Sequence, residues 1–256
     1  MIIPQPHQGD LTSSRRAALV VALAALLVLT EQVLTGGPLT DIDVDIAMWL
    51  RGQGPRHPFI LAMAEVISRI ATPQWSVAGS LVLAGGMSRC ARSWQPLKRT
   101  TAAVGLLSAT VLGMKMLIDR PGPRGSGATG YFPSGHTATA VVCGGTLLLL
   151  AHGLWPGLRR FHLRRLVVLW ALLVGWAMTW HNYHWLTDVI AAWLLGGLLL
   201  VALSSWRSPV KGPGVPGQPR HAPRQLGVQL VPVPVAGPSL ANGHARLDAT
   251  IPNAPT

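Results

Sequence analysis

The sequence predicts an all-α integral membrane protein, built as a bundle of six transmembrane helices with an interfacial helical segment on the extracytoplasmic side. The first observation is composition, because 49% of the 256 residues are apolar and 12% are charged, with a mean hydropathy of +0.38. The second is a set of six apolar segments near the length of about 20 residues that a helix needs to cross a bilayer. The third is the placement of the basic residues between these segments, so that the net charge of +12 indicates topology and not nucleic-acid binding.

The predicted spans are residues 16–35, 74–89, 100–118, 135–154, 166–182 and 186–205. Residues 57–72 are an additional apolar segment, in which Glu65 and Arg69 lie four residues apart and therefore on one helix face. We expect an amphipathic or interfacial helix there. A seventh span is the alternative.

Four basic segments fix the predicted orientation. They are Arg15 and Arg16; Arg89, Arg92, Lys98 and Arg99; Arg159, Arg160, Arg164 and Arg165; and Arg207 with Lys211. Six spans place all four on one side, which the positive-inside rule makes cytoplasmic, whereas seven spans would divide them. The N-terminal residues 1–15 and a disordered, Pro- and Gly-rich tail over 206–256 are then expected in the cytoplasm.

The opposite, extracytoplasmic side receives residues 36–73, 119–134 and 183–185. Three acids in the first of these segments, Asp41, Asp43 and Asp45, are expected to be solvated turn residues before an amphipathic helix. The two cysteines, Cys90 and Cys143, lie at or inside apolar segments, which argues against a disulfide framework or a cysteine-ligated metal.

The first motif on that side is Pro133-Ser134-Gly135-His136. Ser134 is a good helix N-cap, and Gly135 lets another group approach the backbone closely. Free N–H groups at a helix N-terminus bind anions such as phosphate, and His136 would lie beside them in the first turn. The alternative is a capped helix whose histidine faces lipid headgroups.

The second motif is His184 followed four residues later by Asp188, so both side chains share a helix face. Asp188 can accept the Nδ1–H of His184, which leaves Nε2 free as a base or nucleophile. The alternative is an interfacial histidine followed by an acid that stabilises the helix dipole.

The third motif consists of Lys115 at the outer end of a span and Arg120 just before Pro121. Lys115 could be functional or could extend its amine to the interface, and Arg120 could be an ordinary loop cation. Taken together, the three motifs suit phosphoryl transfer, which needs cations and amides around the phosphate oxygens, an in-line nucleophile and an acid. No cluster with metal-ligand spacing accompanies them, so no metal or cofactor is expected.

These motifs resemble those of the type 2 phosphatidic acid phosphatase superfamily, over about residues 36–205. The family pattern is Lys, six residues, Arg-Pro; then Pro-Ser-Gly-His; then Ser-Arg, five residues, His, three residues, Asp. The resemblance implies that His184 is the nucleophile that forms a phosphohistidine, that Asp188 orients it and that His136 is the acid for the leaving group. It also implies a phosphate-binding set of Lys115, Ser134 and Gly135.

The sequence departs from this pattern at two arginines. The family arginine after Lys115 falls on Gly122, and the arginine before His184 falls on Met178. Arg120, two residues earlier than the family position, is the expected phosphate-binding replacement, and Arg124 and His181 are possible accessory residues.

The sequence therefore predicts a metal-independent phosphatase of the cell membrane, with an extracytoplasmic site and cytoplasmic termini. Its expected partners are a lipid phosphate or polyprenyl diphosphate substrate and the bilayer, with no nucleic acid. Two alternatives are a non-catalytic relative that binds or transports lipid phosphates, and a phosphotransferase whose acceptor is not water.

Overall fold

The computed structural model describes residues 8–125, 127–155 and 160–204, without the side chains of residues 8–13, 160 and 161. Every regular element in these ranges is a helix, which confirms the predicted all-α class. The predicted tail, 206–256, lies outside the described residues, as do residues 1–7 of the predicted N-terminal segment.

The helices follow one another with short connections, except between α5 and α6. They are α1 (Gln8–Thr35), α2 (Pro38–Gln53), the 3₁₀ turn η1 (Gly54–Arg56), α3 (Pro58–Ile70), α4 (Pro73–Cys90), α5 (Gln95–Leu117), α6 (Gly135–Leu154), α7 (Arg160–Trp180) and α8 (Leu186–Ser204).

Five of the described helices are long and apolar enough to cross a membrane, and the chain is an integral membrane protein. The five segments are Ser14–Thr35, Gln95–Leu117, Gly135–Leu154, His162–Trp180 and Leu186–Ser204. By the length and composition of the described helices, five of the six predicted spans are therefore found. The missing one is α4, an 18-residue helix whose glycines and serines lower its hydropathy, although it packs against α5 and α6.

The alternative of a seventh span at residues 57–72 is not supported. The helix that forms there, α3, has 13 residues. At about 1.5 Å per residue it is roughly 20 Å long, which is shorter than the hydrocarbon core of about 30 Å.

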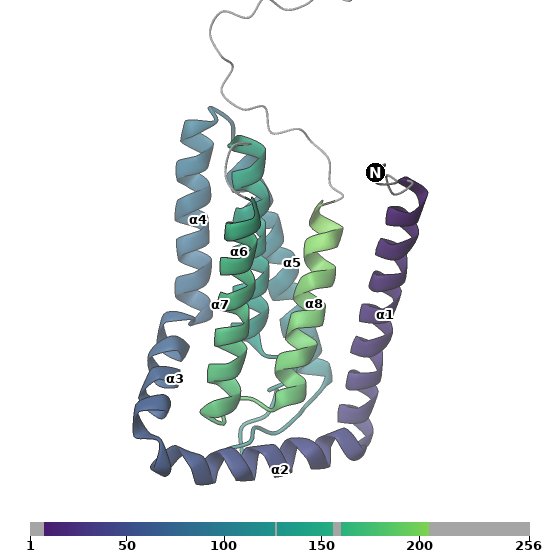
Figure 1. Cartoon of the computed structure of the whole chain (residues 1–256), viewed down its shortest axis with the longest axis vertical. Coiled ribbons are helices and arrows are strands. Elements are labelled where there is room, and N and C mark those ends of the chain that lie inside the picture. Colours follow the sequence, from purple (N-terminus) through teal and green to yellow (C-terminus); the bar gives the residue numbers. More distant parts are fainter. Residues whose placement is uncertain (1–7, 126, 156–159, 205–256) are drawn as a thin grey trace, which may run out of the picture. The chain divides into compact units, whose positions relative to one another are not determined.

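The central helix of the bundle is α6, which contacts α4, α5, α7 and α8 and is the most enclosed of the five spans (Figure 1). Small residues allow this close packing. A Cβ atom added to Gly145 would lie 2.3 Å from Leu200, and one added to Gly196 of α8 would lie 2.7 Å from Val141. The N-terminus of α6, which carries the Pro-Ser-Gly-His motif, is therefore held by helices on several sides.

The three motifs lie at one end of this bundle and the described basic segments at the other. Figure 1 shows the start of α1, the α4–α5 turn and the end of α8 at the upper end, and the α5–α6 loop and the α7–α8 turn at the lower end. The bundle thus separates the described basic segments from the three motifs, as the six-span prediction required.

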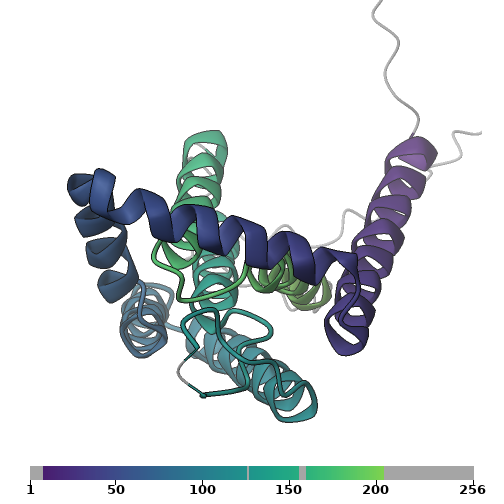
Figure 2. The same ribbon diagram turned by 90° about the horizontal axis from the view of Figure 1, so that it is seen from below.

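Helix α2 runs across the lower end of the bundle (Figures 1 and 2), in the position expected of an interfacial helix. Its buried face carries Asp43, Ala47 and Leu50, whose spacing of four and three residues matches one side of a helix. Its other face exposes large apolar side chains such as Met48 and Trp49, which suits a membrane interface.

The expectation that Asp41, Asp43 and Asp45 are all solvated is wrong for one of them. Asp41 and Asp45 are exposed, but Asp43 is only 2% exposed. The reason is helical geometry: all three acids lie within α2 and not in a turn before it. Asp43 falls on the face of α2 that packs on the bundle, whereas Asp41 and Asp45, two residues away on either side, fall on the opposite face.

Candidate functional site

A hydrogen bond between the first two motifs joins the N-termini of α6 and α8. The backbone N–H of Ser134 donates to the carbonyl oxygen of Asp188 at 3.1 Å. Ser134 is the N-cap of α6, as predicted, and its Oγ accepts the N–H of Thr137 at 3.5 Å. Among the described residues, no group accepts the N–H of Gly135 or His136, so both amides can bind an anion.

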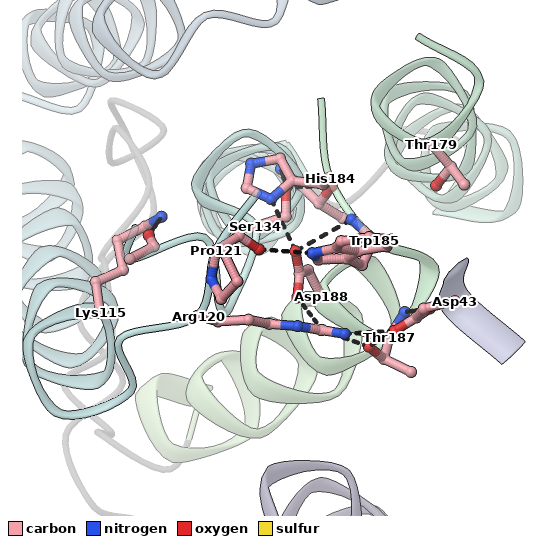
Figure 3. Close-up of polar contacts among 12 residues, drawn as sticks. Asp43, Lys115, Arg120, Pro121, Ser134, Thr179, His184, Trp185, Thr187 and Asp188 are labelled. Atoms are coloured by element: carbon pink, nitrogen blue, oxygen red, sulfur yellow. Dashed lines mark hydrogen bonds and ion pairs between the residues drawn. The ribbon is translucent and has the colours of Figure 1, made fainter. Parts of the chain in front are cut away.

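His184 is held by the fully buried carboxylate of Asp188 (Figure 3). Its Nδ1 lies 3.2 Å from Asp188 Oδ2, and the same oxygen accepts the backbone N–H of Trp185 at 3.1 Å. An ionised carboxylate only accepts hydrogen bonds, so it favours the tautomer with a proton on Nδ1. The lone pair of Nε2 is then free, as the sequence predicted.

The other oxygen of Asp188 is occupied by Arg120. Arg120 Nη1 lies 2.5 Å from Asp188 Oδ1, and Arg120 Nη2 lies 2.6 Å from Asp43 Oδ2. Thr187 completes the cluster, because its Oγ1 accepts from Arg120 Nη1 and donates to Asp43, while its N–H donates to Asp43 Oδ1 at 3.0 Å. A continuous chain of charged contacts therefore runs from α2 through the α5–α6 loop to α8 and His184.

These contacts give Arg120 a different place from the phosphate ligand that the sequence suggested. The residue is 8% exposed, both of its Nη groups are bound to carboxylates, and its guanidinium lies 5.4 Å from the centre of the Trp185 ring. It does not line the pocket that contains the histidines. We therefore treat Arg120 as a residue that positions Asp188.

His136 and His184 line a common pocket of about 300 Å³. Its walls come from three parts of the chain that are distant in sequence and include Glu65, Arg69, Tyr131, His136, Met178 and His184. The rings of Tyr131 and His184 meet edge to face, with centroids 5.5 Å apart. The two histidines are also near enough to interact electrostatically, which suits an acid and a nucleophile acting on one phosphorus.

Lys115 approaches the same region from the end of α5. Its Nζ donates to the carbonyl oxygen of Gly130, and the side chain is half-buried. Its charge interacts with both His136 and Asp188. Lys115, like Arg120, does not line the pocket, but its amine is bound to a neutral carbonyl and not to a carboxylate, so it remains the candidate for phosphate binding that the sequence indicated.

The structure explains why arginine is missing from the two expected positions. A Cβ atom on Gly122 would lie 2.4 Å from the ring of Tyr131, so this ring occupies the space that a side chain would need. Met178 is fully buried and lines the pocket beside the histidines. An apolar wall therefore stands where the family pattern has a cation.

Arg124 and His181, the predicted accessory residues, form a cluster beside the pocket. Arg124 Nη2 donates to the carbonyl oxygen of His181 at 2.7 Å, and the guanidinium lies 3.9 Å from the centre of the Tyr183 ring. His181 Nε2 is 3.0 Å from Glu65 Oε2. Neither Arg124 nor His181 lines the pocket. Their contact instead holds the α5–α6 loop to the α7–α8 turn.

Glu65 connects α3 to this cluster. It accepts from Arg69 Nε at 2.7 Å and from the hydroxyl of Tyr183 at 2.7 Å. These two hydrogen bonds, that of Arg69 first, hold the pKa of Glu65 below its usual value. Burial, followed by the hydrogen bond to Glu65, raises the pKa of Tyr183. The carboxylate is therefore ionised at neutral pH and anchors α3 over the pocket.

The motifs did not indicate the roles of Asp43, Thr187, Tyr131 and the pair Glu65 and Arg69 of α3. The spacing of Asp43 with Ala47 and Leu50 was a signal for Asp43, because it places the acid on one helix face with a small and an apolar residue. No local pattern marks Tyr131 or Arg69 as pocket residues, since both reach the histidines through tertiary packing.

Residues 99–211, which contain all three motifs, match the profile of the PAP2 superfamily. The family predicted from the motifs is therefore the one whose profile this segment matches. The fold is similar to the crystal structure of the first transmembrane PAP2 type phosphatidylglycerolphosphate phosphatase from Bacillus subtilis, with a TM-score of 0.67 and 20% identity. The match covers 73% of this chain and 94% of that one. The search of curated proteins gave no match.

The ion pairs of Arg120 predict a large stability difference between two acids of α2. Replacing Asp43 with Asn leaves Arg120 with one carboxylate, and we expect the free energy of unfolding to fall by about 3 kcal/mol, the lower end for a broken buried pair. Asp45→Asn, on an exposed part of the same helix, should change it by less than about 0.5 kcal/mol. Unfolding of the detergent-solubilised variants measures both, and equal losses would contradict the assignment.

Proposed function

We propose that this protein is an integral-membrane phosphatase that hydrolyses a lipid phosphate or polyprenyl diphosphate through a phosphohistidine intermediate. The observation that carries the proposal is the arrangement of His184, held by buried Asp188, in one pocket with His136. The match of residues 99–211 to the PAP2 superfamily supports the same reaction class.

In the first step, Nε2 of His184 attacks phosphorus and the bond to the leaving oxygen breaks. Asp188 stabilises the positive charge that develops on the imidazole, because its carboxylate accepts the Nδ1–H. His136 donates a proton to the leaving oxygen. The products are a phosphoryl group on His184 and the leaving group, which is the lipid alcohol for a monophosphate and the lipid monophosphate for a diphosphate.

In the second step, water attacks the phosphohistidine and His136 accepts its proton. The bond between nitrogen and phosphorus breaks, phosphate leaves, and both histidines return to their starting states. The free N–H groups of Gly135 and His136, together with Lys115, would stabilise the phosphate oxygens in both steps. Ser134 contributes by capping the helix that presents these amides. Cations and amides thus supply the charge stabilisation in this mechanism, which uses no metal.

We also propose that the site faces the extracytoplasmic side of the cell membrane. The support is the separation of the motif end of the bundle from the end that carries Arg15, Arg89 and Arg99. The exposed apolar side chains of α2 would lie in the interface of the same leaflet. A lipid substrate could then enter from the outer leaflet.

A second candidate function is lipid-phosphate binding without turnover. Gly122 and fully buried Met178 favour it, because both stand where the family pattern has an arginine. A bidentate arginine contact contributes strongly to binding of a phosphoryl group. Release of phosphate distinguishes hydrolysis from binding alone. Formation of a new phosphoester with an added alcohol would instead reveal phosphotransfer.

Phosphate release tests the catalytic assignment. Purified protein in detergent is expected to release phosphate from at least one of phosphatidic acid, phosphatidylglycerol phosphate and farnesyl diphosphate. His184→Ala should lower kcat by at least about a thousandfold, because it removes the nucleophile. His57→Ala, at an exposed histidine outside the pocket, is the matched control. Retention of activity by His184→Ala would overturn the mechanism.

Cysteine labelling tests the orientation. Native Cys90 is exposed at the end of α4, and Cys143 is buried. In intact cells, a membrane-impermeant maleimide should not label wild-type Cys90 but should label an Ala128→Cys variant in a Cys90→Ser background. Ala128 is exposed in the α5–α6 loop. The opposite labelling pattern would place the site in the cytoplasm.

A further inference from the structure

Arg69 of α3 is at the mouth of the pocket whose base holds the histidines. Its side chain is 78% exposed, whereas His184 is 8% and Met178 0% exposed. All three residues line the same pocket. The pocket therefore has a deep part, where chemistry can occur, and an outer part that carries a cation.

Arg69 is the only lysine or arginine among the described residues that line this pocket. Three other arginines near the motif end, none of which lines the pocket, have partners in the protein. Arg120 binds Asp43 and Asp188, and Arg124 binds His181. Arg51 donates to the carbonyl oxygen of Pro123 at 2.7 Å. The outer cation of the pocket is therefore Arg69.

A hydrogen bond to Glu65 orients the guanidinium of Arg69. Its Nε donates to Glu65 Oε1, while Tyr183 and His181 hold the other oxygen of Glu65. Among the described residues, neither Nη group of Arg69 has a partner. Two parallel N–H groups in a fixed plane match the geometry of two phosphate oxygens, which a lysine cannot reproduce.

We propose that Arg69 binds a second phosphate of the substrate headgroup and so selects lipids that carry two adjacent phosphates. This inference rests on the proposed function, in which the terminal phosphate reaches His184 at the base of the pocket. A lipid monophosphate has only its ester oxygen and apolar tail toward the mouth. In a headgroup with two phosphates, the second anionic group follows the first toward the mouth, where Arg69 lies.

Farnesyl diphosphate and farnesyl monophosphate test the proposal, because they share a tail and differ by one phosphate. The wild-type protein is expected to show a kcat/KM at least about ten times higher for the diphosphate. Arg69→Gln should lower the ratio of the two kcat/KM values about tenfold, mainly through KM for the diphosphate. Arg69→Lys should recover only part of it, because lysine lacks the planar fork.

Two further variants exclude trivial causes of this result. Arg89→Gln removes an exposed arginine at the far end of α4 and should leave the ratio at the wild-type value. Arg69→Gln also frees the charge of Glu65, which could repel an anion. In the double variant Glu65→Gln with Arg69→Gln the ratio should stay low. Recovery of the ratio there, or an equal loss for both substrates in Arg69→Gln, would overturn the proposal.

Binding to a His184→Ala protein separates this inference from the proposed function. Isothermal titration with farnesyl diphosphate should show about tenfold weaker binding when Arg69→Gln is added, and a smaller change for the monophosphate. If this difference appears although the wild-type protein turns over neither compound, the hydrolase function fails and the role of Arg69 stands. If turnover occurs and neither the kinetic nor the binding difference appears, the role of Arg69 fails alone.

Discussion

The guanidinium of Arg120 is a buried positive charge, and the geometry of the site depends on how that charge is balanced. Two carboxylates surround it, Asp43 from α2 and Asp188 from α8, so the cluster carries one excess negative charge. The hydroxyl and N–H of Thr187, the N–H of Trp185 and the N-terminal dipole of α8 offset that excess. Since an unpaired buried charge is very costly, these contacts favour the observed packing of the three segments.

The consequence for the proposed function is that His184, the proposed nucleophile, is oriented by residues that do not touch it. His184 contacts Asp188, Asp188 contacts Arg120, and Arg120 contacts Asp43 of α2, which lies 77 residues earlier in the chain. A second, more exposed network orients Arg69 at the mouth of the pocket. In this network Glu65 binds Arg69 and joins α3 to the α7–α8 turn. The inner network fixes the histidine, and the outer network fixes the cation that we assign to substrate selection.

Spacing along the chain was enough to predict the parts of the site that lie on single helices. Ser134 as an N-cap and the His184–Asp188 pair depend on contacts three or four residues apart, which helical geometry determines. The partners of Arg120 and the ring that occupies the space above Gly122 depend on packing between segments far apart in sequence, which spacing cannot reveal. The same limit applies to α4, because burial against α5 and α6 compensates for a composition that hydropathy alone does not identify as a span.

The proposed mechanism has one chemical requirement, that the phosphoryl group be transferred first to Nε2 of His184 and only then to water. Rapid acid-free quenching of a reaction with substrate labelled in its terminal phosphate, followed by peptide mapping, tests this requirement most directly. The account predicts an acid-labile, alkali-stable label on the peptide that contains His184, absent from the His184→Ala protein. Steady turnover without any label on the protein, or a label on His136, would contradict it.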